Sequence, residues 1–283
     1  MAHRLRGKSA VVTGGGNGIG RAVALALAAE EAMVVVNDIG REPNGKSMAD
    51  EVVEEIKKSN GTAVANYDSV ATVLGGENII KTATSNFGRI DILVNCAGNF
   101  RAARTVDMTE NDWDSIIEVH LKGHFNCTRA AALEMTKQKS GRIINISSRA
   151  AFSCPPFGLP SLAYSTAKAG ILGFTMVLSG ELKEHGITVN AILPSANTKL
   201  FPGTAPRGGD LPSSFMLDPD FVAPIIVYLA TDEAQNITGQ LIYASGGDLC
   251  IYARLLQPHA FIRKMGKWTV DELIEVIPPL RVC

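Results

Sequence analysis

The chain has 283 residues, of which 46% are hydrophobic and 19% charged, so it can bury a sizeable core and is not intrinsically disordered. Its formal net charge of −1, without a lysine and arginine cluster, argues against nucleic acid as a partner. No run of about 18 apolar residues is present, so we expect no membrane partner. Five cysteines without a CxxC pair are typical of free thiols in a reducing, cytoplasmic setting.

Short β-branched segments alternate with helix-length segments from the N-terminus onward. The predicted strands are residues 10–13, 33–37, 62–66, 90–95, 142–147, 188–193 and 240–243. The predicted helices are residues 19–31, 46–59, 77–87, 110–137, 162–184 and 220–231. Several strands are apolar throughout, as expected when helices cover both faces of a sheet. The pattern predicts an α/β fold: one Rossmann-type, doubly wound, parallel, seven-stranded sheet with helices on both faces.

Two segments interrupt the alternation. Residues 195–219 are rich in proline and glycine, too rich for a long helix, and are predicted to form a substrate flap. Residues 253–283 form a C-terminal tail beyond the last predicted strand. Because no linker rich in proline, glycine or serine divides the chain, we expect residues 1–283 to be a single dinucleotide-binding and catalytic domain.

A glycine-rich segment follows the first predicted strand and opens the first predicted helix. Gly14, Asn17, Gly18, Ile19 and Gly20 lie where backbone amides and a helix N-terminus can hold a pyrophosphate. Glycine is needed there because a side chain would keep the phosphate away from the amides. An ordinary tight turn is the alternative, but the strand, the helix and a downstream acid all lie where a dinucleotide fingerprint requires them.

Asp38 is that acid, at the end of the second predicted strand. Its carboxylate can accept hydrogen bonds from the adenosine ribose hydroxyls, and it would face a 2′-phosphate at close range. Two unit charges 4 Å apart repel by roughly 4 kcal/mol at an effective dielectric of 20, so the sequence predicts NAD rather than NADP as the cofactor. A turn-forming role for Asp38 is the alternative, and the nearby Arg41 would weaken the discrimination.

Tyr164 and Lys168 are four residues apart in a predicted helix and therefore share one face. An ammonium beside a phenol stabilises the phenolate, and lowering its pKa by two to three units from about 10 takes roughly 3–4 kcal/mol, which one close cation and the charge of oxidised nicotinamide together can supply. Tyr164 would then be a general base for alcohol oxidation and a general acid for the reverse. A Tyr-x-x-x-Lys pair alone is a common surface feature. Here it follows a predicted strand that ends in Ser147-Ser148, where a hydroxyl can bind the substrate oxygen.

These motifs together resemble the classical short-chain dehydrogenase/reductase family over nearly the whole chain. The matching motifs are Thr13-Gly14-x-x-x-Gly18-x-Gly20, Asn95-Cys96-Ala97-Gly98, Ser148 and Tyr164-x-x-x-Lys168. The resemblance implies a homotetramer, in which the long predicted helices at 110–137 and 162–184 are the expected interface. It also implies a catalytic trio of Ser148, Tyr164 and Lys168, an adenine contact at Asp68, and further cofactor contacts at Ser69, Asn95, Ala97, Gly98, Tyr164 and Lys168.

Within the family, the chain is similar to the (3R)-hydroxyacyl-CoA dehydrogenase part of the peroxisomal multifunctional enzyme of β-oxidation. Residues 35–40, 63–70 and 119–123 carry this likeness, which implies a 3-hydroxyacyl-CoA thioester as the small-molecule substrate. Six cations of the flap and tail would either meet the phosphates of coenzyme A or form a solvated surface: Lys199, Arg207, Arg254, Arg263, Lys264 and Lys267. A steroid, polyol or other small-alcohol dehydrogenase remains an alternative, as does a non-catalytic NAD-binding sensor.

Some positions depart from the family pattern. Cys96 replaces an asparagine and is expected only to pack. His120 stands where many members have the asparagine that supports a proton-relay water; we expect the relay to survive through the backbone, and count His120 among the candidate catalytic residues. The segment after the sixth strand is also unusual, and Thr198 is the expected nicotinamide contact. His124 lies four residues after His120 without a third ligand, so we predict a buried polar pair and no metal.

Overall fold

The computed structural model describes residues 3–152, 161–200 and 217–252. Contacts between residues divide the chain into two compact units, Met1–Ile251 and Tyr252–Cys283. Every helix and strand given below belongs to the first unit. The predicted tail at 253–283 and residues 201–216 of the predicted flap lie outside the described residues, and the single-domain organisation stays a prediction.

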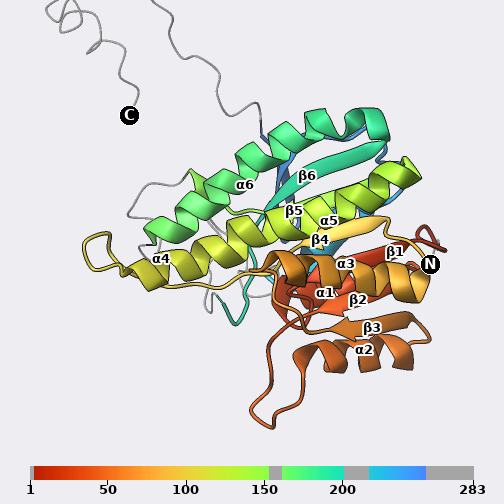
Figure 1. Cartoon of the computed structure of the whole chain (residues 1–283), viewed down its shortest axis with the longest axis horizontal. Coiled ribbons are helices and arrows are strands. Elements are labelled where there is room, and N and C mark those ends of the chain that lie inside the picture. Colours follow the sequence, from red (N-terminus) through yellow and green to blue (C-terminus); the bar gives the residue numbers. More distant parts are fainter. Residues whose placement is uncertain (1–2, 153–160, 201–216, 253–283) are drawn as a thin grey trace, which may run out of the picture. The chain divides into compact units, whose positions relative to one another are not determined.

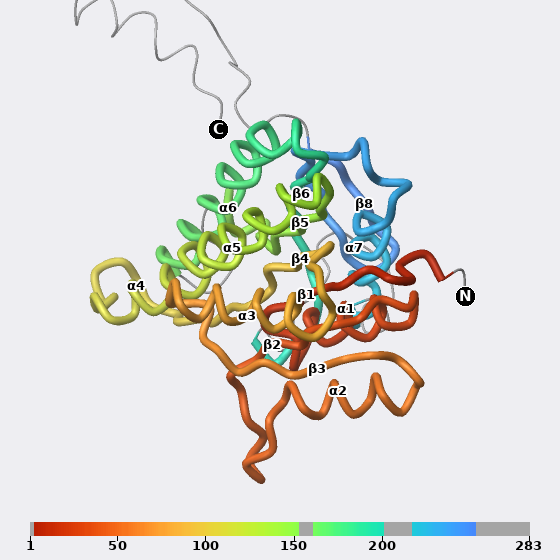
Figure 2. The backbone as a smooth tube through the Cα atoms, turned by 45° about the vertical axis from the view of Figure 1, so that its right-hand side comes forward, coloured from red at the N-terminus to blue at the C-terminus, as the bar shows by residue number. Residues whose placement is uncertain are grey.

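The strands form one mixed sheet in the order β3-β2-β1-β4-β5-β6-β7-β8, which can be followed from β6 to β3 in Figure 2. All neighbours from β3 to β7 pair in parallel, so the predicted doubly wound parallel sheet is confirmed. The strands are β1 (Ser9–Thr13), β2 (Met33–Asn37), β3 (Thr62–Asn66), β4 (Ile92–Asn95), β5 (Gly141–Ile146), β6 (Ile187–Pro194), β7 (Leu241–Ser245) and β8 (Asp248–Ile251).

The predicted count of seven strands was wrong, because the sheet has eight. The additional strand, β8, pairs antiparallel with β7, and Ser245 lies opposite Asp248. Only Gly246 and Gly247 separate the two strands, and Gly246 has a φ of +54°. Two glycines between short strands are a signal for a tight hairpin, so the sequence did contain the information for this strand.

Helices cover both faces of the sheet, as Figure 1 shows for the face under α3, α5 and α6. The core on the opposite face is formed with α1, α2 and α7. Strands β1 and β5 are buried along their whole length because both of their faces are covered. The helices are α1 (Gly18–Ala29), α2 (Met48–Lys58), α3 (Val73–Phe87), α4 (Glu110–Ile117), α5 (Gly123–Gln138), α6 (Leu162–Glu181) and α7 (Ala223–Ala230).

The predicted helix over residues 110–137 is not continuous. A π-helical turn, Glu118–Lys122, separates α4 from α5. One inserted residue rotates the following helix by about 100°, which lets His120 point inward with 1% of its surface exposed while α5 still packs on α3. Such turns are frequent at functional sites. In the described ranges, no helix is long and apolar enough to cross a lipid bilayer.

The strand order fixes where a ligand can bind. From β1 the chain continues to β2 and β3 on one side and then crosses to β4 on the other. Ligands of such sheets bind at the carboxyl ends of the strands, at the point where the order reverses. The carboxyl ends of β1 and β4, where Thr13 lies beside Asn95, therefore mark the position of the site.

Candidate active site

The turn between β1 and α1 has room only for glycine at several positions. Gly14 and Gly18 have φ values of +64° and +52°. A Cβ atom on Gly14 would lie 2.7 Å from the Cα of Ala97, and one on Gly20 would lie 2.1 Å from the carbonyl oxygen of Gly14. Asn17 caps α1 through its Oδ1, which accepts the Gly18 N–H at 2.7 Å. The turn therefore packs tightly on the loop after β4 and presents the start of α1 to a ligand, a shape that fits a dinucleotide pyrophosphate.

Thr13 joins this turn to the loop after β4. Its hydroxyl oxygen accepts the backbone N–H groups of Cys96 at 3.0 Å and Ala97 at 3.2 Å. Thr13 is 1% exposed and its two partners are half-buried, so these hydrogen bonds are partly shielded from water. Thr13 was absent from the predicted site residues, although its place directly before the first glycine was the signal that could have found it. Burial raises the pKa of the Cys96 thiol to about 11, so this residue is neutral at pH 7.

Asp38 lies directly after β2, beside the glycine-rich turn. Its carboxylate accepts the Gly16 N–H at 2.9 Å and the Gly40 N–H at 2.7 Å. The guanidinium of Arg41 donates to the carbonyl of Gly45 at 3.0 Å, within its own loop. The structure thus places a negative charge next to the turn and directs the nearby cation to a backbone carbonyl.

Asp68 and Ser69 follow β3. The Asp68 carboxylate accepts the side-chain amides of Asn66 at 2.8 Å and Asn78 at 3.0 Å. The hydroxyl of Ser69 accepts the N–H of Ala71 at 3.3 Å. Both side chains are half-buried at the carboxyl edge of the sheet, near the end of β2, where an adenine would be bound.

Asn95, at the end of β4, has a different environment from the loop that follows it. Its side-chain amide donates to Thr128 at 2.9 Å and to Asn145 at 3.0 Å, and it is 1% exposed. Asn95 therefore anchors the sheet to α5. Ala97 and Gly98 form the loop itself, and a Cβ atom on Gly98 would lie 2.5 Å from the His120 ring.

Ser148, Tyr164 and Lys168 lie together at the carboxyl end of β5. Ser161 caps α6 by accepting the Tyr164 N–H at 3.3 Å, which fixes the first turn of the helix that carries Tyr164 and Lys168. The Ser148 hydroxyl accepts the Ala150 N–H at 3.1 Å and forms a hydrogen bond with the Tyr164 side chain. The Lys168 ammonium lies 5.6 Å from the centre of the Tyr164 ring.

Tyr164 and Lys168 are almost completely buried, and burial shifts the pKa of both groups. Tyr164 is 8% exposed and Lys168 is 4% exposed. Burial raises the pKa of the Tyr164 phenol, whereas its hydrogen bond with Ser148 lowers it. Burial also lowers the pKa of Lys168 to about 8, and its Nζ donates to the Ile146 carbonyl at 2.6 Å. The predicted lowering of the Tyr164 pKa needs the charge of oxidised nicotinamide as well as that of Lys168, and it stays a prediction.

His120 and Phe100 pack edge-on against the Tyr164 ring. The ring centres lie 5.2 Å from Tyr164 for His120 and 5.3 Å for Phe100, with interplanar angles of 90° and 80°. The Nε2 atom of His120 lies 2.7 Å from the Asn99 carbonyl oxygen and 3.1 Å from the Asn99 nitrogen, and its tautomer decides whether it donates to the first or accepts from the second. Burial and the Lys168 charge hold the pKa of His120 well below its usual range, so the ring is neutral. The structure brings His120 to Tyr164 as a packing partner, and its part in a proton relay stays a prediction.

Burial lowers the pKa of His124, on α5, to about 3. Within the described ranges, no group of three or more His, Cys, Asp or Glu side chains is arranged to hold a metal ion.

The first residues of the predicted flap lie beside the glycine-rich turn. A Cβ atom on Gly18 would lie 3.2 Å from the Cγ2 of Thr198. The Asn197 N–H donates to the Leu217 carbonyl at 2.7 Å, which joins the two described ends of the flap. Lys199 pairs with Glu42 at 3.0 Å, so this cation is engaged on the cofactor side of the site. The other five cations predicted to meet coenzyme A (Arg207, Arg254, Arg263, Lys264 and Lys267) lie outside the described residues.

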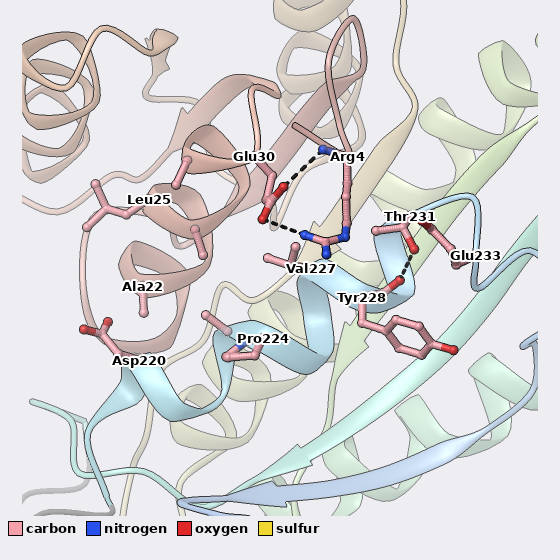
Figure 3. Close-up of a pocket in the computed structure, with 13 residues that line it drawn as sticks. Arg4, Ala22, Leu25, Glu30, Asp220, Pro224, Val227, Tyr228, Thr231 and Glu233 are labelled. Carbon is pink, nitrogen blue, oxygen red and sulfur yellow. Dashed lines mark hydrogen bonds and ion pairs between the residues drawn. The ribbon is translucent and has the colours of Figure 1, made fainter. Parts of the chain in front are cut away.

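A hollow of about 850 Å³ lies between α1 and α7, away from these residues (Figure 3). The Arg4 guanidinium and Glu30 carboxylate form an ion pair at one side, at 3.2 Å. None of the predicted site residues lines the hollow, so it is separate from the catalytic group. Its apolar wall consists of Ala22, Leu25, Ala26, Ala29, Ala223, Pro224 and Val227.

Comparison with known proteins agrees with this geometry. The family model of the short chain dehydrogenases matches residues 8–201. The chain is 41% identical over 252 residues to the peroxisomal multifunctional enzyme type 2 of Mus musculus, a match that covers 87% of this chain and 33% of the mouse enzyme. The chain therefore spans about a third of the length of that relative.

Two further matches cover nearly the whole of the other protein. The chain is 42% identical over 248 residues to a 3-oxoacyl-[acyl-carrier-protein] reductase of Synechocystis sp., covering 86% of this chain and 97% of the reductase. The crystal structure of a short chain dehydrogenase from Mycobacterium avium has a TM-score of 0.87 and 38% identity, and the match covers 98% of this chain and 95% of that one. The predicted resemblance is confirmed: the chain belongs to the short-chain dehydrogenase family.

Proposed function

We propose that this short-chain dehydrogenase is an NAD-dependent enzyme that interconverts a secondary alcohol and a ketone, using Ser148, Tyr164 and Lys168. The observation that carries the proposal is the grouping of these three residues at the carboxyl end of β5, where Tyr164 and Lys168 are buried and Ser148 is half-buried. A phenol hydrogen-bonded to Ser148 and a lysine of low exposure beside it form a site for proton transfer, and such pairs of perturbed groups cluster at functional sites.

Each of the three residues has a distinct task in this mechanism. Ser148, fixed by the Ala150 N–H, and Tyr164 together hold the substrate oxygen. Tyr164 accepts the alcohol proton during oxidation and returns a proton to the carbonyl oxygen during reduction. The Lys168 ammonium favours the phenolate form through its positive charge. NAD, when bound, supplies the nicotinamide that accepts the hydride.

The residues of the glycine-rich turn fit a dinucleotide. Gly14, Gly18 and Gly20 leave the space that side chains would fill, and Asn17 starts α1 beside it. Asp38 supports the choice of NAD, because its charge lies at the turn, where the 2′-phosphate of NADP would be repelled. Arg41, which donates to the Gly45 carbonyl, offers little compensation.

The proposed substrate is a 3-hydroxyacyl-CoA thioester. Its support is the likeness to relatives named as a peroxisomal multifunctional enzyme and as a reductase of 3-oxoacyl groups on an acyl carrier protein. A steroid, polyol or other small alcohol is the alternative substrate. A non-catalytic sensor is disfavoured because Ser148, Tyr164 and Lys168 are all present and lie together at the carboxyl end of β5.

We also propose a cytoplasmic homotetramer. Large apolar side chains on the outer faces of α5 and α6 support an interface there: Phe125, Leu133, Leu162, Met176 and Val177 are all at least 39% exposed. Light scattering at micromolar concentration tests the assembly. A particle of 30.1 kDa, the mass of one chain, would contradict it.

The activity is tested by following NADH absorbance with purified protein and panels of 3-hydroxyacyl-CoA thioesters, steroids and polyols. The proposal expects NADH from a 3-hydroxyacyl-CoA with NAD, and much less product with NADP. Formation of NADH only from a steroid or polyol would reject the thioester as the substrate but would still support dehydrogenase activity. Absence of Tyr164-dependent NADH from every panel would reject the enzyme.

A further inference from the structure

Arg149 follows Ser148 directly and begins a short 3-10 turn, Arg149–Ala151. Its guanidinium carbon lies 4.6 Å above the ring centre of Tyr243, on β7. One of its nitrogens donates to the hydroxyl of Ser195, directly after β6, at 3.4 Å. The Ser195 N–H in turn donates to the Ala244 carbonyl at 3.0 Å, which fixes Ser195 on β7. Arg149 is therefore held at the carboxyl ends of three neighbouring strands, the edge where ligands of this architecture bind.

Arg149 differs from the other arginines of low exposure in its lack of a carboxylate partner among the described residues. Three arginines in residues 3–152, 161–200 and 217–252 are not exposed: Arg21, Arg142 and Arg149. Arg21 pairs with Glu55 at 2.6 Å, and Arg142 pairs with Asp232 at 3.4 Å. Arg149 forms no ion pair with any carboxylate of those ranges. A guanidinium partly removed from water is normally paired with an anion, and residues 3–152, 161–200 and 217–252 provide none for Arg149.

The geometry of Arg149 suits an oxyanion. A guanidinium presents donors in a planar fork that matches a carboxylate or phosphate. Stacking on Tyr243 fixes the plane of this fork, and Ser195 accepts from only one nitrogen. Among the described residues, the other donors of this guanidinium therefore remain available to a ligand, and little side-chain freedom is left to be lost when the ligand binds.

We infer that Arg149 is a substrate-recognition residue, which binds a carboxylate carried on the acyl part of the substrate. The inference rests on the proposed function, because it takes Ser148 and Tyr164 as the groups that hold the reacting oxygen. Arg149 is the next residue after Ser148 and lies at the same edge of the sheet, so we place its anion on the part of the substrate nearest the reacting carbon. The phosphates of coenzyme A are separated from that carbon by the whole pantetheine arm, which favours a carboxylate on the acyl chain.

The test compares two thioesters of equal chain length, 3-hydroxyhexanoyl-CoA and 3-hydroxyadipoyl-CoA, which differ in a terminal carboxylate. We expect the native chain to prefer the adipoyl compound. Arg149→Gln is expected to lower kcat/KM for that compound by about 10- to 100-fold, the loss of one charge-assisted contact, and to change the hexanoyl value by less than about threefold. Arg149→Lys keeps the positive charge but loses the planar fork of donors, so its kcat/KM for the adipoyl compound should lie between those of the native chain and Arg149→Gln.

Arg6→Gln is the matched control. It removes the same charge from an exposed pair with Glu31, before β1 and so at the amino ends of the strands, and should leave both kcat/KM values unchanged. Equal losses for both thioesters in Arg149→Gln would show a structural role and overturn the inference. The same measurements are made with the pantetheine thioesters of the two acyl groups. If Arg149→Gln lowers kcat/KM for the coenzyme A thioesters but not for the pantetheine thioesters, Arg149 binds a phosphate of coenzyme A, and the proposed carboxylate site is wrong.

A binding measurement separates this inference from the proposed function. Calorimetry with Tyr164→Phe, with and without Arg149→Gln, measures affinity for the two thioesters without turnover. Equal affinities for both compounds would overturn the Arg149 inference even if the native chain forms NADH. An affinity difference that depends on Arg149, without NADH from any compound, would support the anion site and reject the proposed function.

Discussion

The glycine-rich turn after β1 and the catalytic end of α6 lie on the same edge of the sheet but are built in opposite ways. The turn works through missing side chains, since a Cβ atom on Gly20 would lie 2.1 Å from the Gly14 carbonyl. The end of α6 works through side chains that are present and buried, since Tyr164 and Lys168 are 8% and 4% exposed. The first region depends on backbone shape, and the second on charge in a poorly solvated place. Changes in the turn should therefore alter folding and cofactor choice, and changes in α6 should alter turnover and its pH dependence.

Tyr164→Phe should give the largest effect in the catalytic region. It removes the proton carrier but keeps the ring that packs on His120 and Phe100, so we expect turnover to fall by about two to four orders of magnitude. Affinity for NAD, measured by fluorescence titration, should stay within about twofold. Tyr228→Phe on α7, an exposed tyrosine far from the site, is the control. Near-normal turnover in Tyr164→Phe would remove the proposed mechanism.

Thr13→Val should give the largest effect in the cofactor region. It leaves the half-buried N–H groups of Cys96 and Ala97 without their acceptor, and each such loss costs up to about 1–3 kcal/mol. We expect the free energy of unfolding to fall by about 2–4 kcal/mol in urea titrations. Thr62→Val, an exposed threonine on β3, should change it by less than about 0.5 kcal/mol. Equal stabilities for the two variants would show that Thr13 does not join the turn to the β4 loop.

Asp38→Ala should change cofactor choice more modestly. Removing the carboxylate removes the repulsion of a 2′-phosphate, so the ratio of kcat/KM for NADP to that for NAD should rise by about tenfold or more. Affinity for NAD should also fall, because the Gly16 and Gly40 amides lose their acceptor. Asp107→Ala, in the exposed loop before α4, is the control. Equal use of NADP by the native chain would refute this interpretation of Asp38.

Patterns confined to one turn or one helix were visible in the sequence. The glycine-rich turn, Asp38 and the Tyr164 and Lys168 pair each depend on spacing along a single element, and the structure places them at the carboxyl edge as expected. Contacts between distant segments were not visible. The position of Arg149 against Ser195 and Tyr243 depends on the order of three strands, which no local pattern encodes.

The start of α3 shows how tertiary packing overrides a local preference. The sequence predicts a helix from residue 77, since Gly75 and Gly76 disfavour helices. The helix begins at Val73, with Thr72 accepting the Gly75 N–H at 3.0 Å. A Cβ atom on Gly76 would lie 2.7 Å from the backbone of Asn126 on α5. Glycine at position 76 therefore lets α3 approach α5. The sequence does not show this contact, because it joins two segments that are far apart along the chain.

The smallest expected effect is the pH dependence of the native enzyme, and its sign follows from burial. Burial raises the pKa of Tyr164 and lowers the pKa of Lys168 to about 8. Because the ammonium lies 5.6 Å from the centre of the phenol ring, we expect the two groups to share protons as a pair and to lose the first proton near the pKa of Lys168, about 8. Below this pH the phenol and the ammonium are both protonated, the form that gives a proton to a carbonyl. Above it the pair has one proton fewer, which includes the phenolate and ammonium form that accepts the alcohol proton.

Oxidation should therefore rise with pH through about 8, and reduction should fall over the same interval, each by about tenfold or less between pH 7 and pH 9. Initial rates in both directions, at saturating cofactor, measure this. In Lys168→Met only the phenol titrates, and burial holds its pKa above the usual value, so the residual oxidation should rise at a higher pH than in the native chain. The same midpoint in both proteins would mean that the two groups do not share protons. The burial of Lys168 would then not affect the reaction, and the buried charge that distinguishes the catalytic region from the glycine-rich turn would be that of Tyr164 alone.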